Sequence, residues 1–295
     1  MSRPIETVAV LGGGTMGRGI AHVAALAGYR TRLADVSREV LDAARGTIEK
    51  NLDKGVSLGK VDPADAEAAL ERLSLHEELG DAVGDAGLVI EAVPEDLRLK
   101  LELFERTEEL APADALFATN TSALSVTEIA GATKRAERFA GMHFFNPVHI
   151  MKLIELVRGL ETAPETLEAL TTVAHAMGKQ VVTVNEAPGF VTSRINAMIG
   201  NEAFRMLQEG VASAEDIDTA LKLGLNHPMG PFEMVDLVGL DVRLSILEYL
   251  HRTLGETYRP ARLLVQHVRA GRLGKKVGRG VYDYDADGRR VGGGS

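Results

Sequence analysis

One short stretch near the N-terminus restricts the fold more than any other part of the chain. Residues 7–11, TVAVL, are apolar and β-branched, which predicts a buried strand. The glycines of a G-x-G-x-x-G pattern follow at once, at Gly12, Gly14 and Gly17, and apolar residues then recur at helical spacing as far as Gly28. A strand, a glycine turn and a helix in this order are typical of a βαβ unit in a parallel sheet.

The glycine turn and the acid that follows it predict a dinucleotide site. Glycines at these positions permit a tight turn, close approach of the backbone to a pyrophosphate, and tight packing of helix against strand. The next predicted strand, residues 31–35, ends in Asp35. This carboxylate can bind both ribose hydroxyls of an adenosine and repels a 2′-phosphate, so NAD is favoured over NADP. A glycine turn with a solvated aspartate is the structural alternative. We expect NAD to contact Gly12, Gly14, Thr15, Met16, Gly17 and Asp35.

The rest of the chain changes character near residue 186. Before it, apolar strand-like runs alternate with helical patterns, and two helices in residues 38–73 form a hairpin. After it, the periodicity is helical and no strand pattern is found up to about residue 270. We therefore predict a Rossmann-type, doubly wound, mostly parallel sheet in residues 1–186, an all-helical C-terminal domain in residues 187–284, and a disordered tail in residues 285–295.

Composition excludes several classes of protein. The 295 residues include no cysteine, which removes disulfides, thiolate nucleophiles and cysteine–zinc sites. The formal charge of −9 argues against broad binding to nucleic acid. No run reaches the roughly 20 apolar residues of a membrane span, no signal peptide precedes the first strand, and no histidine pair has the HExxH spacing of a zinc site. We expect a cytoplasmic protein with no metal, membrane or nucleic-acid partner.

A base and an acid stand in two neighbouring apolar runs. His143 lies in residues 138–145 and Glu155 in residues 152–157, on either side of the turn-forming Asn146-Pro147. Buried polar groups are costly unless they are paired. A histidine can take and return a proton near neutral pH, and a carboxylate beside it fixes its tautomer and stabilises the imidazolium. A core histidine bonded to a structural acid is the alternative, but a position at a strand end favours catalysis.

Ligands of open α/β sheets bind beyond the carboxyl ends of the strands. The polar residues expected there are Glu91 to Glu95, Asn120 to Ser122, and His143 to Asn146. Ser122 has no G-x-S-x-G surroundings, so we interpret it as a hydrogen-bond donor to substrate rather than a nucleophile. A turn serine that caps the next helix is the alternative.

In order along the chain, the motifs GGGTMGRGIA, VIEAVPEDL, ATNTSALSVTEIA, HFFNPVHIMKLIE, PGFVTSR, LGLNHPMGPFEMVDLVGLD and GRLGKKVGRGVYDY occur. With these motifs the chain resembles the L-3-hydroxyacyl-CoA dehydrogenase family over about residues 5–284. The resemblance implies reversible, NAD-dependent oxidation of (S)-3-hydroxyacyl-CoA to 3-ketoacyl-CoA by a homodimer formed through the helical domain. It favours the short-chain bacterial members and a C4 substrate, 3-hydroxybutyryl-CoA.

The resemblance also assigns roles to single residues. It makes His143 the catalytic base and Glu155 its partner, and it places Ser122 and Asn146 at the reacting substrate and the nicotinamide. The other residues it implies are Glu95, Lys100 and Lys276 for the cofactor, and Asn51 and Lys54, with Lys60 as a third candidate, for the coenzyme A tail.

Two positions depart from the family pattern. Ala123 stands where a second serine is common, and Ser193, in PGFVTSR, stands where a substrate-pocket asparagine is expected. Serine keeps a hydrogen-bond donor but is shorter than asparagine. This departure leaves the identity of the substrate undetermined, but it does not affect the expected His–Glu chemistry. Two other functions therefore remain as alternatives: an NAD-dependent dehydrogenase of a small, CoA-free hydroxy acid, and a non-enzymatic NAD-binding protein.

Overall fold

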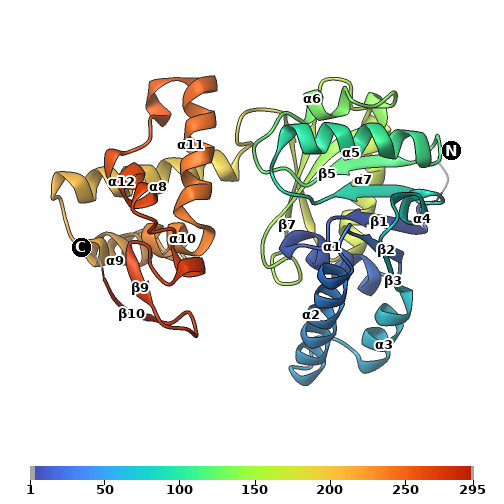
Figure 1. Ribbon diagram of the computed structural model, residues 1–295, viewed down its shortest axis with the longest axis horizontal. Helices are drawn as coiled ribbons and strands as arrows, with labels where there is room; N and C mark the ends of the chain where they lie inside the picture. The colour runs from blue at the N-terminus through green and yellow to red at the C-terminus, as the bar shows by residue number, and fades with distance from the viewer. Residues whose placement is uncertain (1–3, 294–295) are drawn as a thin grey trace. The chain divides into compact units, whose positions relative to one another are not determined.

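The computed structural model describes residues 4–293 and divides the chain into two compact units, Met1–Ala187 and Pro188–Ser295. Figure 1 shows both units and labels most of their helices and strands. Within residues 4–293, no helix is long and apolar enough to cross a membrane.

The first unit is built on one sheet of eight strands, in the order β3-β2-β1-β4-β5-β6-β7-β8. Every neighbouring pair is parallel except β6 and β7, which are antiparallel. The chain runs outward from β1 in both directions, so the predicted doubly wound, mostly parallel sheet is confirmed. The strands are β1 Thr7–Leu11, β2 Arg30–Ala34, β3 Leu73–His76, β4 Leu88–Glu91, β5 Leu116–Thr119, β6 Phe139–Phe144, β7 Leu153–Arg158 and β8 Gln180–Asn185.

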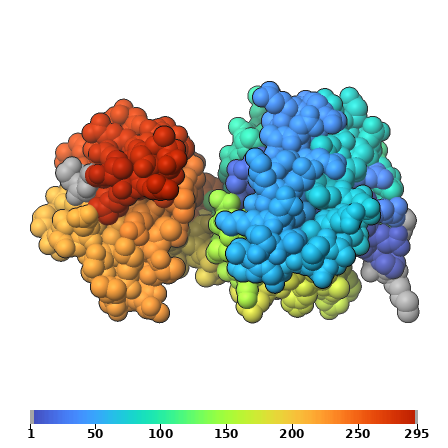
Figure 2. Space-filling model, turned by 90° about the horizontal axis from the view of Figure 1, so that it is seen from below, coloured from blue at the N-terminus to red at the C-terminus, as the bar shows by residue number. Residues whose placement is uncertain are grey.

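Helices cover this sheet, and their ends follow from local sequence. The Ser37 side chain accepts a hydrogen bond from Val40 N–H to cap α2, and Asp62 caps α3 in the same way through Ala64 N–H. These two helices are the predicted hairpin and form one face of the unit (Figure 2). The helices are α1 Thr15–Leu26, α2 Arg38–Ser57, α3 Pro63–Arg72, α4 Leu79–Val83, α5 Leu97–Leu110, α6 Val126–Ala130 and α7 Pro164–Ala176.

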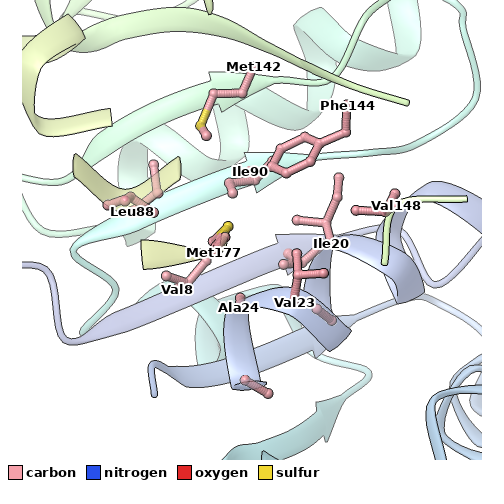
Figure 3. Packing of buried hydrophobic residues seen from close by; sticks show 14 of the residues in the cluster. Val8, Ile20, Val23, Ala24, Leu88, Ile90, Met142, Phe144, Val148 and Met177 are labelled. Carbon is pink, nitrogen blue, oxygen red and sulfur yellow. The ribbon is translucent and has the colours of Figure 1, made fainter. Parts of the chain in front are cut away.

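The core of the first unit lies where α1 packs against the sheet (Figure 3). The side chains of Val8, Ile90 and Met142 come from three strands, and Ile20 and Ala24 come from α1; none of the five exposes any surface. Apolar burial stabilises a fold by about 25 cal/mol per Å². This packing fixes the start of α1, and with it the glycine turn.

The second unit is mainly helical, as predicted, but it is not all-helical. Strand β9 pairs antiparallel with β10, so the predicted disorder of residues 285–295 is wrong for residues 285–293; residues 294 and 295 lie outside the described part. The glycine-rich sequence of this segment gives no strand signal. The strand is supported by Arg290, which lies 3.6 Å over the Tyr282 ring and forms an ion pair with Glu215. The elements are α8 Thr192–Glu209, α9 Ala214–Gly224, α10 Pro231–Val238, α11 Leu240–Leu254, α12 Arg262–Arg269, β9 Tyr282–Tyr284 and β10 Arg290–Gly293.

Two buried aspartates form hydrogen bonds that join the β9–β10 pair to the helices. Asp236 accepts hydrogen bonds from Val281 N–H, Tyr282 N–H and the Tyr284 hydroxyl. Asp218 accepts one from the Tyr282 hydroxyl and two from the backbone at the start of α10. Burial raises the pKa of both carboxyls, and these hydrogen bonds oppose that rise. Strand β9 and Val281 before it are therefore hydrogen-bonded to α10 through Asp236.

Candidate active site

The glycine turn joins β1 to α1 and has the shape of a phosphate cradle. Gly12 has φ +106°, and a Cβ there would lie 2.7 Å from the Ala92 carbonyl oxygen. A Cβ on Gly17 would lie 1.7 Å from the Gly12 oxygen, so both positions require glycine. A Cβ on Gly14 would meet nothing within 4 Å, and the first turn of α1 has neither an acid nor a side-chain cap. The N–H groups of that turn therefore face open space, which suits a pyrophosphate.

Asp35 stands at the end of β2, against the same turn. Its Oδ2 accepts a hydrogen bond from Gly13 N–H at 2.8 Å, and its Oδ1 accepts one from Ser37 N–H at 3.1 Å. Each carboxylate oxygen can accept a second bond, and the side chain is half-buried. The turn and Asp35 thus fit the adenosine and pyrophosphate of NAD.

A buried charge cluster lies at the ends of β4 and β5. Lys100 Nζ is 2.6 Å from Glu91 Oε1 and 3.3 Å from Glu95 Oε2. Glu91 is fully buried and also accepts a hydrogen bond from the Thr119 hydroxyl. Burial raises the pKa of Glu91, and Lys100 opposes that rise. The buried ammonium of Lys100 therefore forms ion pairs with two carboxylates.

Glu95 connects this charge cluster to Ser122, the serine predicted to contact substrate. Its Oε1 accepts hydrogen bonds from the Thr121 hydroxyl and from Ser122 N–H, at 2.6 and 2.8 Å. The structure thus brings Glu95, Lys100 and Ser122 together. The N-cap of the following helix, α6, is Ser125. The alternative in which Ser122 caps that helix is therefore wrong.

His143 and Glu155 face each other across the antiparallel pair β6–β7. The imidazole Nδ1 lies 2.8 Å from Glu155 Oε2, and the two residues are 6% and 1% exposed. The Phe145 ring lies 4.5 Å from the imidazole. A carboxylate on Nδ1 keeps the proton there in the neutral ring and leaves Nε2 as the basic nitrogen.

Asn120, directly after β5, binds the backbone beside this pair. Its Oδ1 accepts a hydrogen bond from Phe144 N–H at 2.8 Å, which ties the end of β5 to the residue after His143. We expected residues 120–122 at this edge but gave Asn120 no role. Its signal in the sequence is an amide directly after a buried strand, a position that also fits an ordinary turn residue.

The remaining residues predicted in the first unit lie on its surface. Asn146 is exposed in the turn after β6, Lys54 is exposed on α2 near the half-buried Asn51, and Lys60 is exposed in the α2–α3 connection. Within residues 4–293, no group of three metal-ligating side chains could hold an ion.

A histidine stack lies on the first unit, beside the turn after β6. The His22 and His149 rings are stacked with centroids 5.4 Å apart, and Lys179 donates to the Val148 and Met151 carbonyls. Burial, with His149 and Lys179 as positive neighbours, lowers the pKa of His22 to about 4. His22 is therefore neutral at physiological pH and acts as packing.

A hollow of about 590 Å³ in the first unit lies at the opposite edge of the sheet. Its lining includes Thr7 and Leu116, which begin β1 and β5, and Ala163 before α7. None of the residues predicted to bind NAD or substrate lines it. The residues predicted to bind NAD or substrate from the strand ends lie instead at the carboxyl edge, where ligands of an open α/β sheet bind.

Two predicted residues belong to the second unit. Lys276 Nζ lies 2.6 and 2.7 Å from the two carboxylate oxygens of Asp241. Ser193 is half-buried in the first turn of α8. Asn201, further along α8, donates to the Arg259 carbonyl and accepts from Ala261 N–H, so its amide is occupied structurally. Asn196, between Ser193 and Asn201 on the same helix, is half-buried.

Known proteins resemble this chain over almost its whole length. The probable 3-hydroxybutyryl-CoA dehydrogenase of Bacillus subtilis is 45% identical over 95% of this chain and 98% of its own. The 3-hydroxyadipyl-CoA dehydrogenase of Escherichia coli is 44% identical over 96% of this chain and 60% of its own. The crystal structure of (S)-3-hydroxybutyryl-CoA dehydrogenase from Ralstonia eutropha superposes with a TM-score of 0.91, at 41% identity, covering 95% of this chain and 99% of that one.

Two models of one protein family account for both units. The NAD-binding domain of 3-hydroxyacyl-CoA dehydrogenase matches residues 7–187, and the C-terminal domain of the same family matches residues 189–284. The glycine turn, with Asp35 beside it, lies inside the first match, which gives NAD as the cofactor. The chain belongs to the 3-hydroxyacyl-CoA dehydrogenase family.

Proposed function

We propose that this member of the family oxidises (S)-3-hydroxybutyryl-CoA to acetoacetyl-CoA, reversibly, with His143 as the general base. The observation that carries the proposal is the buried His143–Glu155 pair, at 2.8 Å, in the unit that holds the glycine turn. The names of the relatives from Bacillus subtilis and Ralstonia eutropha support the C4 acyl group.

The geometry of the pair supports the proposed proton path. NAD, when bound, accepts the hydride that leaves C3 of the substrate. His143 takes the hydroxyl proton at Nε2, the ring nitrogen that does not bind Glu155. Glu155 stabilises the imidazolium that results, and in reduction the imidazolium returns its proton. Because Glu155 is 1% exposed, little solvent weakens that stabilisation.

Other residues orient the reactants. Ser122 donates its hydroxyl to the reacting oxygen, on a backbone held by Glu95. Asn146 contacts substrate and nicotinamide, and Glu95, Lys100 and Lys276 support the cofactor. Because Lys100 is buried, we assign it to holding Glu95 in place.

The coenzyme A tail and the acyl group use further polar residues. Asn51 and Lys54 on α2 are proposed to hold the tail, since an exposed ammonium suits a phosphate. Ser193 is proposed to reach the substrate oxygen through a water, which costs roughly 0–2 kcal/mol of ordering. The helical unit is proposed to form a homodimer, which light scattering at micromolar concentration would check, and cell fractionation would check the cytoplasmic location.

Oxidation of NADH by the wild-type chain tests the proposed function. Acetoacetyl-CoA should be reduced with many turnovers per site, with NADH preferred to NADPH because Asp35 repels a 2′-phosphate. Free acetoacetate should be a far poorer substrate. Equal rates with and without coenzyme A would favour a dehydrogenase of small hydroxy acids, and no turnover beyond one per site would favour a binding protein.

A further inference from the structure

His149 presents a flat ring at the surface of the first unit. Its ring stacks on that of His22, with centroids 5.4 Å apart and an interplanar angle of 8°. His22 lies in α1 and is 3% exposed, whereas His149 is exposed in the turn after β6. Because the buried ring covers its inner side, His149 turns its edge and its outer face to the surface. A ring with one face packed and the other open suits stacking with another planar group.

The loop that carries His149 is fixed by its neighbours. Lys179 is buried and donates hydrogen bonds to the carbonyls of Val148 and Met151, on either side of His149. Val148 lies against α1 (Figure 3), where a Cβ on Gly19 would lie 2.8 Å from the Val148 side chain, so glycine permits this close approach. The ring is therefore held in place without a ligand, and a ligand that stacks on it orders little of the protein.

The charges around His149 select the class of planar group. Burial and the ammonium groups of Lys179 and Lys54 lower the pKa of His149, so its ring is neutral at physiological pH. A neutral aromatic ring stacks with a nucleobase, whereas an anion is attracted to a cation. Lys54 is exposed on α2 and near enough to act on His149, and its ammonium suits a phosphate. The ring and the ammonium together fit a nucleotide.

The same loop connects this ring to the catalytic pair. His149 follows His143 by six residues, which limits the separation of their Cα atoms to about 20 Å. The pantetheine arm and the diphosphate, which separate the thioester of an acyl-CoA from its adenosine, can bridge a distance of this length. Asn51 and Lys54, the residues proposed to hold the coenzyme A tail, are three residues apart and share one face of α2. All of these residues belong to the first unit.

We propose that the His149 ring stacks with the adenine of the coenzyme A tail and makes the enzyme prefer a full coenzyme A ester. This inference rests on the proposed function and names the part of the substrate that His149 contacts. A phosphate of the same tail, or the adenine of NADH, is the other group that a histidine at this place could bind, and the variants below distinguish these contacts.

Thioesters with and without adenosine give the first test. Reduction by NADH is measured for acetoacetyl-CoA and for acetoacetyl-4′-phosphopantetheine, which keeps one phosphate and lacks the adenosine. His149→Ala should lower kcat/KM for acetoacetyl-CoA by roughly 5- to 150-fold, the loss expected when an aromatic ring under a base is removed. The loss should be absent with the thioester that lacks adenosine. His175→Ala, which removes an exposed histidine of α7, is the matched control and should change neither value. An equal loss with both thioesters, or no loss with either, would overturn the inference.

Two further variants separate stacking from charge. His149→Phe keeps a flat ring and should keep most of kcat/KM for acetoacetyl-CoA, whereas His149→Lys keeps a cation without a ring and should fall to the level of His149→Ala. The reverse order would assign the position to a phosphate and overturn the inference. A raised KM for NADH, with the preference for coenzyme A unchanged, would assign the ring to the adenine of NADH and also overturn it. No turnover of acetoacetyl-CoA by wild type would overturn the proposed function itself, before any variant is made.

Discussion

Buried charges are handled differently in the two units of the molecule. In the first unit, Lys100 lies 2.6 Å from Glu91, and His143 lies 2.8 Å from Glu155. In the second unit, Arg243 is as deeply buried, yet its Nε has no partner among the described residues. A buried charge that is paired inside the chain loses less free energy on burial than one that lacks such a bond.

Removing the base should have the largest effect. His143→Gln should lower kcat for acetoacetyl-CoA by about 10²–10⁴-fold, because general acid–base catalysis contributes that much. NADH affinity, followed by quenching or enhancement of NADH fluorescence, should be retained. A variant with near-normal kcat would make the pair a structural contact and remove the distinction from Glu91–Lys100.

Breaking the structural pair should reduce stability rather than chemistry alone. Lys100→Met leaves the buried Glu91 without its cation, which should lower the free energy of unfolding in urea by about 3–5 kcal/mol. Arg98→Met on the same helix breaks only an exposed pair with Glu102 and should change stability little. Glu91→Leu combined with Lys100→Met should recover part of the loss. Equal stability of Lys100→Met and Arg98→Met would contradict the assignment.

Arg243 should respond with the opposite sign. Burial lowers its pKa to about 10 in the fold, so the charged form opposes folding. Arg243→Met should raise the free energy of unfolding by about 1–3 kcal/mol. Arg252→Met, at an exposed position of the same helix, serves as the control. A clear destabilisation by Arg243→Met would mean that the guanidinium already has a compensating partner.

His22 should show an effect only in acid. Its folded pKa of about 4 lies below the ordinary value of 6.5. Between these values the unfolded chain binds a proton that the folded chain does not, so stability falls as pH drops from 6.5 to 4. The loss attributable to His22 reaches at most about 3 kcal/mol. His22→Gln should remove that part of the pH dependence; identical profiles would show that His22 titrates alike in both states.

Features that depend on short-range sequence patterns could be predicted from the sequence. The turn at Gly12, the acid at Asp35 and the alternating strands follow from residue type and spacing, and all lie where a Rossmann-type sheet requires. Strand β3, Leu73–His76, was not predicted, because four residues directly after a helix carry no strand period. Strand β10 was missed because its support, the contact of Arg290 with Tyr282 and Glu215, is long-range.

Partners of charged residues were the least predictable part of the site. His143 and Glu155 were paired correctly, since a single turn connects their strands. The bonds from Glu91 to Lys100 and Thr119 depend on the order of strands in the sheet. Arg243 looks like an ordinary helical surface residue in the sequence, and only the packing of three helices reveals that it is buried.

The central claim is that His143 and Glu155 act as one catalytic unit, and a double-variant cycle tests it most directly. The kcat for acetoacetyl-CoA reduction is measured for wild type, His143→Gln, Glu155→Gln and the double variant, at saturating NADH. Residues that act as a unit are not additive. The double variant should therefore be no slower than His143→Gln alone, and Glu155→Gln should be slowed less than His143→Gln. Effects that multiply in the double variant would show that the two residues act independently and would contradict the claim.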